Sequence, residues 1–197
     1  MDDAVVLELM RHAKTKGNVE RRYVGWTDDP IVEAALPVVD DSAQLVICSD
    51  LIRTEQTARA YFPNASLHPI KHFRESHFGD FDMKTYDELK TNARYRAWID
   101  HPETVAPPNG ETLTAFSARV LEGLKQLPTA RHYYAVLHGG TIRALLVALA
   151  PEPSQFWDWQ VGHDTRFVLS WHSRRAFEEG KRCTSLSVVP LTANAPM

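Results

Sequence analysis

Short apolar runs of strand length recur along this chain and are rich in β-branched residues. They are VVLELM at 5–10, QLVICS at 44–49, YYAVLH at 133–138, RFVLSWH at 166–172 and TSLSVVPL at 184–191. The first three are almost continuously apolar, which is typical of strands covered on both faces of a largely parallel sheet. The last two follow each other closely and predict an antiparallel hairpin at one edge of that sheet.

A helix is predicted over 110–127, because apolar side chains recur there every three or four positions and so lie on one face. Pro107 and Pro108 prevent an earlier start, and Asn109 is expected to cap the helix. Further helices are predicted at 53–62, 84–101 and 141–150. The link 175–182 between the last two apolar runs is interpreted as a solvated turn.

The alternation of strands and helices over 197 residues predicts a three-layer α/β/α sandwich. Its sheet is expected to be mostly parallel with an antiparallel edge. The chain contains no repeat and no linker long enough to divide it, so one domain over 1–197 is predicted. Sheets of this kind bind ligands outside the carboxyl ends of their strands.

Basic side chains follow three of the predicted strands at that edge. Arg11 and His12 follow the first strand, Arg53 begins the helix after the second, and His138 ends the third. Cationic groups that converge in this way repel one another unless an anion lies between them, and guanidinium forks match phosphate geometry. The sequence therefore predicts a phosphate-binding site.

Other residues could add chemistry to this site. Gly139 and Gly140 open a helix, whose N-terminal N–H groups favour an anion, and Asn18 can donate a further hydrogen bond. A neutral imidazole can act as a nucleophile towards phosphorus. Glu75, in the stretch FRESHFGDFD, is a candidate carboxylic acid for protonating a leaving oxygen.

Composition narrows the expected partners and location. The 22 Lys and Arg are balanced by 25 Asp and Glu, and a net charge of −3 gives no reason to expect nucleic acid. The opening MDDAVVLELM carries acids where a secretory signal would carry bases, so no membrane association and a cytoplasmic location are expected. No Cys or His spacing predicts a metal site, and His101, His132, His163 and His172 show no ligand spacing at all.

Four segments together resemble the histidine phosphatase superfamily, which has the phosphoglycerate mutase-like fold. They are RHAKT with Asn18, SDLIRTEQTA, RESHFGDFD and LHGGTIRALL, and they stand in that family's order. The resemblance implies that His12 is the phosphorylated nucleophile, that Glu75 is the general acid and base, and that no cofactor or metal is needed. It assigns the binding of the phosphoryl group and the substrate to Arg11, Arg53, His138, Asn18, Gly25 and Gly139.

Within the superfamily, the chain is most similar to alpha-ribazole phosphatases, which dephosphorylate a precursor in cobalamin biosynthesis. The supporting features are the chain length, HFGDFD, YRAWIDHP, PPNGETLTAFSARV and Trp157. The partner implied is a small-molecule phosphate monoester. Alternatives are a phosphoglycerate mutase-type enzyme, a broad-specificity phosphatase and a non-catalytic protein that binds phosphate esters, and a homodimer stays open. Mutases carry adjacent arginines in an insertion after the general acid. The corresponding stretch of this chain has only scattered basic residues, so hydrolysis is favoured over the mutase reaction.

Three features depart from the family pattern. Ala13 replaces a usual glycine, so its φ should be negative or the backbone strained. Segment 29–44 is shorter than in relatives, and the helix there is expected to be cut down. Val24 stands where relatives often have a hydroxyl side chain. Residues 76–110 are expected to form a substrate lid, in which Tyr95 and Trp98 serve either helix packing or substrate cover.

Overall fold

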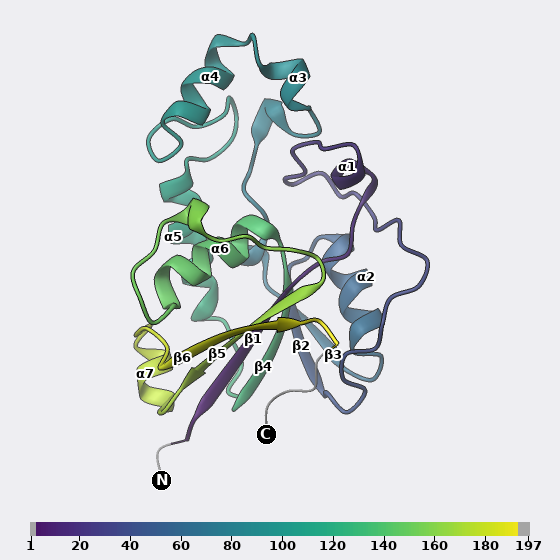
Figure 1. The fold of residues 1–197 in the computed structure, drawn as a ribbon, viewed down its shortest axis with the longest axis vertical. Coiled ribbons are helices and arrows are strands. Elements are labelled where there is room, and N and C mark those ends of the chain that lie inside the picture. Colours follow the sequence, from purple (N-terminus) through teal and green to yellow (C-terminus); the bar gives the residue numbers. More distant parts are fainter. Residues whose placement is uncertain (1–2, 193–197) are drawn as a thin grey trace.

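A single sheet organises the computed structural model, which describes residues 3–192 (Figure 1). The strand order is β3-β2-β4-β1-β5-β6. The strands are β1 Val5–Arg11, β2 Leu45–Cys48, β3 Ser66–Pro69, β4 His132–Leu137, β5 Thr165–Trp171 and β6 Ser185–Pro190. The first four strands of this order pair in parallel, whereas β5 is antiparallel to both β1 and β6. The predicted mostly parallel sheet with an antiparallel edge is confirmed.

Strand β3 was not predicted, because its four residues are not a hydrophobic run. Ser66 and Pro69 are exposed, and Leu67 and His68 are only partly buried. The strand exists because its backbone pairs with β2 at the edge of the sheet, and such a tertiary contact leaves no apolar pattern in the sequence.

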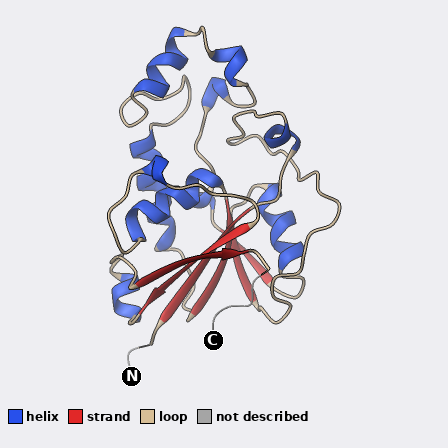
Figure 2. Cartoon of the chain, in the orientation of Figure 1, coloured by secondary structure: helices blue, strands red, loops and turns tan. Residues whose placement is uncertain are grey.

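Helices cover both faces of the sheet and make the three layers (Figure 2). Alternation along β1 sends Leu7 and Leu9 into the core beneath α5 and α6, whereas Met10 packs on the opposite side with residues of α2 such as Ala58. The α-helices are α1 Lys16–Val19, α2 Ile52–Tyr61, α3 Tyr86–Leu89, α4 Ala93–Asp100, α5 Leu113–Leu124, α6 Gly139–Leu149 and α7 Arg174–Glu178. The helices predicted at 53–62, 110–127 and 141–150 correspond to α2, α5 and α6.

Several local predictions were wrong. The helix expected over 84–101 is divided into α3 and α4, because Asn92 accepts hydrogen bonds from the first N–H groups of α4 and so starts a new helix. Asn109 does not cap α5: its φ is +60° and it donates a hydrogen bond to Asp80, while Thr112 is the cap. The link 175–182 is not only a turn, since Ser173 caps the short helix α7.

Segment 29–44 contains no helix, and the helix expected there is absent rather than shortened. An antiparallel bridge joins Ile31 to Thr15, and Asp29 accepts a hydrogen bond from the Gly17 N–H at 2.8 Å. The segment lies between the loop after α1 and the start of β2, and its Val39 packs with residues of α2 such as Ala58.

Helices α3 and α4 project beyond the carboxyl ends of the parallel strands (Figure 1). This cap has a small core of its own, in which Phe81, Leu89 and Tyr95 are buried and Trp98 is partly buried. The hydroxyl groups of Tyr95 and Tyr23 lie 2.6 Å apart, which joins the cap to the loop after α1. No helix within residues 3–192 is long and apolar enough to cross a membrane.

Candidate active site

His12 follows the last residue of β1 and is buried, with 3% of its surface exposed. Its Nδ1 lies 2.7 Å from the carbonyl oxygen of Ala13. Because a carbonyl can only accept, Nδ1 carries the proton and Nε2 carries the lone pair. Burial, Arg53 and Arg11 lower the pKa of His12 well below its ordinary value. The imidazole is therefore neutral near pH 7, with a nucleophilic nitrogen.

Arg11 lies over the first turn of α6. Its Nη1 donates to the carbonyl of Val161 at 2.9 Å, which fixes the guanidinium from the loop before β5. A Cβ at Gly139 would lie 3.3 Å from Arg11 Cζ, so the glycine allows the guanidinium to approach the start of α6 closely. Burial lowers the pKa of Arg11, partly offset by the charge of Glu75.

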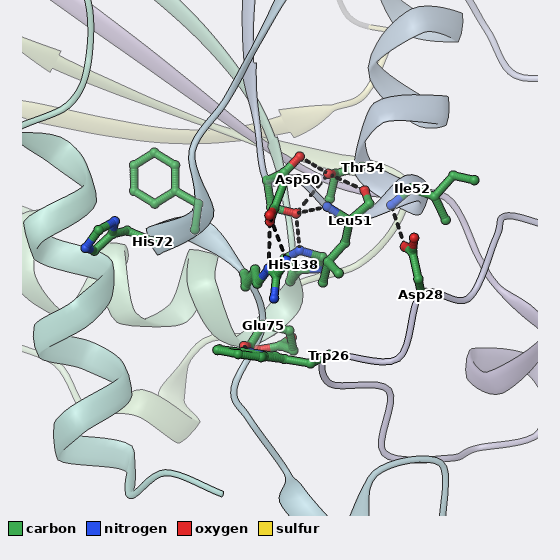
Figure 3. A network of polar contacts seen from close by, with 12 residues as sticks. Trp26, Asp28, Asp50, Leu51, Ile52, Thr54, His72, Glu75 and His138 are labelled. Carbon is green, nitrogen blue, oxygen red and sulfur yellow. Dashed lines mark hydrogen bonds and ion pairs between the residues drawn. The ribbon is translucent and has the colours of Figure 1, made fainter.

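Arg53 is fully buried at the start of α2, with 0% of its surface exposed. Asp28 Oδ1 accepts the Ile52 N–H at 2.7 Å and so holds the first turn of this helix (Figure 3). The guanidinium donates to the carbonyls of Gly25 at 2.7 Å and Thr27 at 3.0 Å. These bonds fix the direction of the guanidinium and connect it to the loop around Gly25.

His138 is fully buried at the junction of β4 and α6. Its Nε2 lies 2.8 Å from Ser49 Oγ, directly after the end of β2. Its ring is 5.2 Å from that of His12, in an edge-on arrangement. Burial, Arg53 and His12 lower the pKa of His138 well below its ordinary value, so this ring is also neutral near pH 7.

Glu75 reaches the same place from the loop before the cap. Its Oε2 accepts the Gly140 N–H at 2.9 Å and its Oε1 accepts the Ser76 N–H at 2.9 Å. A Cβ at Gly140 would lie 2.2 Å from Oε1, so only glycine leaves room for the carboxylate there. Glu75 is also the charge with the largest effect on the pKa of Arg11 and of Arg53, and it raises the pKa of both groups.

Three buried nitrogen atoms of this cluster have no hydrogen-bond partner within residues 3–192. They are Arg11 Nε, Arg53 Nε and His138 Nδ1. Buried polar groups are normally bonded, so donors left over at one place indicate a ligand that accepts from them. Two guanidiniums and two neutral imidazoles with spare nitrogen atoms suit a phosphate group.

The remaining predicted site residues lie in the loops around this cluster. Asn18 Oδ1 accepts the Thr15 N–H at 3.2 Å in the capping box of α1, so a substrate contact falls to its amide nitrogen. The N–H of Gly25 donates to Asp82 at 2.7 Å and its carbonyl accepts from Arg53, so Gly25 shapes the site through its backbone. Ala13 is not among the non-glycine residues with positive φ, so of the two alternatives stated for this position the strained, positive φ is excluded.

Two contacts to the loop after β1 were not predicted from the sequence. His163, just before β5, lies with Nδ1 2.6 Å from the carbonyl oxygen of His12 and its ring 5.8 Å from the His12 ring. Thr57 on α2 accepts the Ala13 N–H at 2.9 Å. A single histidine has no partner at a characteristic spacing, so the sequence indicates no role for His163. Thr57 lies in the segment SDLIRTEQTA, in which only Arg53 was a candidate. Within residues 3–192 no group of His, Cys, Asp or Glu side chains is arranged to hold a metal ion.

The buried neutral histidines predict a dependence of stability on pH. His12, His138 and His163 all have lowered pKa values, that of His163 falling to about 4 through burial and Arg11. In the unfolded chain these histidines bind protons near pH 6.5, whereas in the folded chain they do so only at lower pH. Acidification therefore favours unfolding. The free energy of unfolding should fall by about 1.4 kcal/mol per pH unit for each such histidine below pH 6.5.

Urea denaturation between pH 7.5 and 5 measures this slope. Asn in place of His163 removes one titrating ring while an amide still can donate to the His12 carbonyl, so this variant should show a shallower slope. Equal stability at pH 7.5 and 5.5 would contradict the buried, neutral state of these rings.

The chain belongs to the histidine phosphatase superfamily (branch 1), which it matches over residues 7–180. This is a class of enzymes that act through a phosphohistidine without needing a metal. An adenosylcobalamin/alpha-ribazole phosphatase of Escherichia coli is 29% identical over 171 residues, covering 79% of this chain and 84% of the relative. A 2,3-bisphosphoglycerate-dependent phosphoglycerate mutase of Gloeobacter violaceus is 27% identical, covering 73% and 75% of the two chains.

The solved structures agree with the fold. The alpha-ribazole phosphatase of Shigella flexneri has a TM-score of 0.78 and 25% identity, and the superposition covers 96% of each chain. The predicted membership of the superfamily is confirmed, as is the similarity to both alpha-ribazole phosphatases and phosphoglycerate mutase-like proteins.

Proposed function

We propose that this protein is an alpha-ribazole phosphatase that hydrolyses its substrate through a phosphohistidine at His12. The proposal is carried by an aromatic pocket beside the phosphate-binding cluster. The pocket has a volume of about 210 Å³ and opens next to Glu75 and Gly140. Its aromatic lining consists of Tyr23, Phe78, Trp98, Phe116, Phe156 and Trp157.

The pocket suits a flat aromatic leaving group. Its exposed surface is mostly apolar, and Arg143 lies 5.8 Å from the ring centre of Phe156 and 5.6 Å from that of Trp157. A benzimidazole base can stack on such rings, and the burial of its aromatic surface makes the free energy of binding more favourable. A phosphoglycerate offers a carboxylate instead of a ring, and Arg143 is the single cation among the residues that line this pocket.

The chemistry proposed begins with Nε2 of His12. It attacks phosphorus in line with the ester oxygen, while Arg11, Arg53, His138 and the Gly139 N–H surround the equatorial oxygens. Glu75, as the general acid, gives a proton to the leaving ester oxygen as the bond between that oxygen and phosphorus breaks. The ionised Glu75 then removes a proton from the water that hydrolyses the phosphohistidine.

In this proposal residues 76–110, which include the cap helices α3 and α4, form a lid over the substrate. They contribute Phe78 and Trp98 to the pocket wall, and Tyr95 fixes the lid by packing in its core. Trp98 thus serves the substrate and Tyr95 the packing. The enzyme is proposed to act in the cytoplasm, where a reducing environment matches the free, buried Cys48 and Cys183.

The test is a substrate panel of alpha-ribazole phosphate, p-nitrophenyl phosphate and 3-phosphoglycerate, with phosphate release as the readout. We expect kcat/KM to be highest for alpha-ribazole phosphate. Equal values across the panel would indicate a broad-specificity phosphatase, and isomerisation of phosphoglycerate faster than phosphate release would indicate a mutase. Binding of all three without turnover would indicate a non-catalytic protein.

Trp98→Ala should weaken the enzyme selectively. The loss of one stacking surface is worth about 1–3 kcal/mol, so KM for alpha-ribazole phosphate should rise by about 5- to 150-fold, while KM for p-nitrophenyl phosphate is affected less. Tyr86→Ala is the matched control, because Tyr86 lies on the same cap, is exposed and does not line the pocket. A Trp98 variant with unchanged selectivity would remove the pocket from substrate recognition.

A further inference from the structure

We propose that Trp26, Arg119 and Glu111 form a clamp on the backbone of Glu75 that sets the aim of its carboxyl group. They would be positioning residues for proton transfer to the leaving group, without contact to the substrate's reacting atoms. The inference rests on the proposed role of Glu75 as the general acid.

The clamp begins at the backbone carbonyl of Glu75, which accepts two hydrogen bonds from different parts of the chain. Trp26 Nε1 donates at 2.8 Å and Arg119 Nη2 donates at 3.2 Å. Figure 3 shows the Trp26 ring lying against Glu75. Trp26 belongs to the loop after α1 and Arg119 to α5, so the carbonyl is held from two sides that are far apart in sequence.

Arg119 holds more than this one carbonyl. Its Nη1 donates to the carbonyls of His72 at 2.8 Å and Arg74 at 3.2 Å, so a single guanidinium gathers the loop that leads to Glu75. Glu111 binds the same guanidinium in a bidentate pair, at 2.5 Å to Nη2 and 3.2 Å to Nε. Glu111 Oε1 also accepts the His77 N–H at 2.8 Å, which holds the loop beyond Glu75.

The Trp26 ring is itself fixed by charged and aromatic neighbours. The Arg74 guanidinium lies 4.8 Å from the ring centre, that of Arg119 lies 5.7 Å away, and the His77 ring lies 4.3 Å away. Arg74 is anchored by two 2.7 Å bonds to Asp50 at the end of β2. Cation–π contacts of this kind are favourable and restrict the plane of the ring, so the indole N–H has one direction.

A fixed carbonyl matters because the carboxyl group has little freedom at its other end. Oε2 accepts from Gly140 N–H, and a Cβ at that glycine would already overlap Oε1. The carboxyl group is therefore suspended between the clamp and the first turn of α6, beside the predicted phosphate position. A misplacement of about 1 Å in such an arrangement can cost on the order of a hundredfold in rate.

A structural role and a positioning role differ in one measurable respect. A disturbed general acid slows esters with a basic leaving oxygen, but it affects p-nitrophenyl phosphate little, because p-nitrophenolate leaves without protonation. A general loss of folding slows both esters equally. The readout is therefore the ratio of kcat/KM for p-nitrophenyl phosphate to kcat/KM for an alkyl ester, ribose 5-phosphate.

Trp26→Phe and Arg119→Lys test the clamp. The first keeps the ring and removes the N–H donor; the second keeps the charge and removes the fork. In each variant the ratio of the two kcat/KM values should rise about tenfold above that of the wild type. The ratio should rise further in Glu75→Gln, which removes the acid itself. Arg174→Lys is the matched control, since Arg174 is similarly buried and donates to the backbone carbonyl of Ala130 at a remote site. Its ratio should stay at the wild-type value.

The outcomes separate this inference from the proposed function. An unchanged ratio in both clamp variants, with a raised ratio in Glu75→Gln, would overturn the clamp and leave Glu75 as the acid. An unchanged ratio in Glu75→Gln would overturn the acid assignment and the clamp with it. Should Arg119→Lys melt below the assay temperature, Trp26→Phe alone decides, because it removes one donor and little volume.

Discussion

Replacing His12 with alanine should abolish turnover of every phosphate ester that the protein hydrolyses. The hydrogen bond from Nδ1 to the Ala13 carbonyl leaves Nε2 of the buried, neutral imidazole with a lone pair. Removal of a catalytic nucleophile costs on the order of 10⁵-fold or more in kcat. Phosphate release and mass spectrometry of the acid-labile phosphoenzyme measure the two consequences together.

His172→Ala is the matched control for this variant. His172 is exposed at the end of β5, away from the cluster, so both turnover and phosphoenzyme should persist. Circular dichroism and a melting curve establish that the His12 variant is folded. A phosphoenzyme that still forms on another residue would mean that a different side chain is the nucleophile.

Replacing Glu75 with glutamine should slow both halves of the reaction. The amide cannot supply a proton to the leaving oxygen or remove one from water, and loss of general acid–base catalysis costs about 10²–10⁴-fold. With p-nitrophenyl phosphate, which needs little help in the first half, the second half becomes limiting. The variant should then accumulate phosphohistidine after a burst of p-nitrophenolate.

Rapid quench with detection of the phosphoenzyme measures this accumulation. Glutamine can accept only one of the two backbone N–H groups that Glu75 accepts, so a loss of about 1 kcal/mol in stability accompanies the kinetic effect. Glu122→Gln, an exposed change on α5, is the control. A burst followed by wild-type hydrolysis of the phosphoenzyme would assign the base to another residue.

The part of the site that could be predicted from the sequence consists of residues at strand ends. Arg11, His12 and His138 directly follow or end apolar runs, and parallel strands bring their carboxyl ends to one edge, so the cluster follows from pattern and topology. Arg53 follows from the same topology, because it begins the helix after the second strand. Glu75 was a candidate from its loop, and the family resemblance then implied its role as general acid and base.

The part that could not be predicted makes its contacts through main-chain carbonyls. His163, Arg119 and Trp26 bind backbone oxygens of residues distant in sequence, and such partners leave no spacing rule. The error at Asn109 has a related cause: a tertiary bond to Asp80 stabilises a left-handed backbone, and the cap passes to Thr112. Likewise, α3 and α4 separate because of two local caps, Thr85 and Asn92, within one amphipathic stretch.

The position of β1 in the sheet bears on how the chain is made. This strand precedes its neighbours β4 and β5 by a long stretch of chain; Val6 pairs opposite His132, and Val5 opposite Trp171. Until β4 and β5 have been synthesised, both edges of β1 lack these partners, and pairing at such sequence distance is slow. A nascent chain therefore carries β1 as an apolar strand without its sheet partners until β5 has emerged, and the cluster of Arg11, His12 and His138 can assemble only after β4 has joined the sheet.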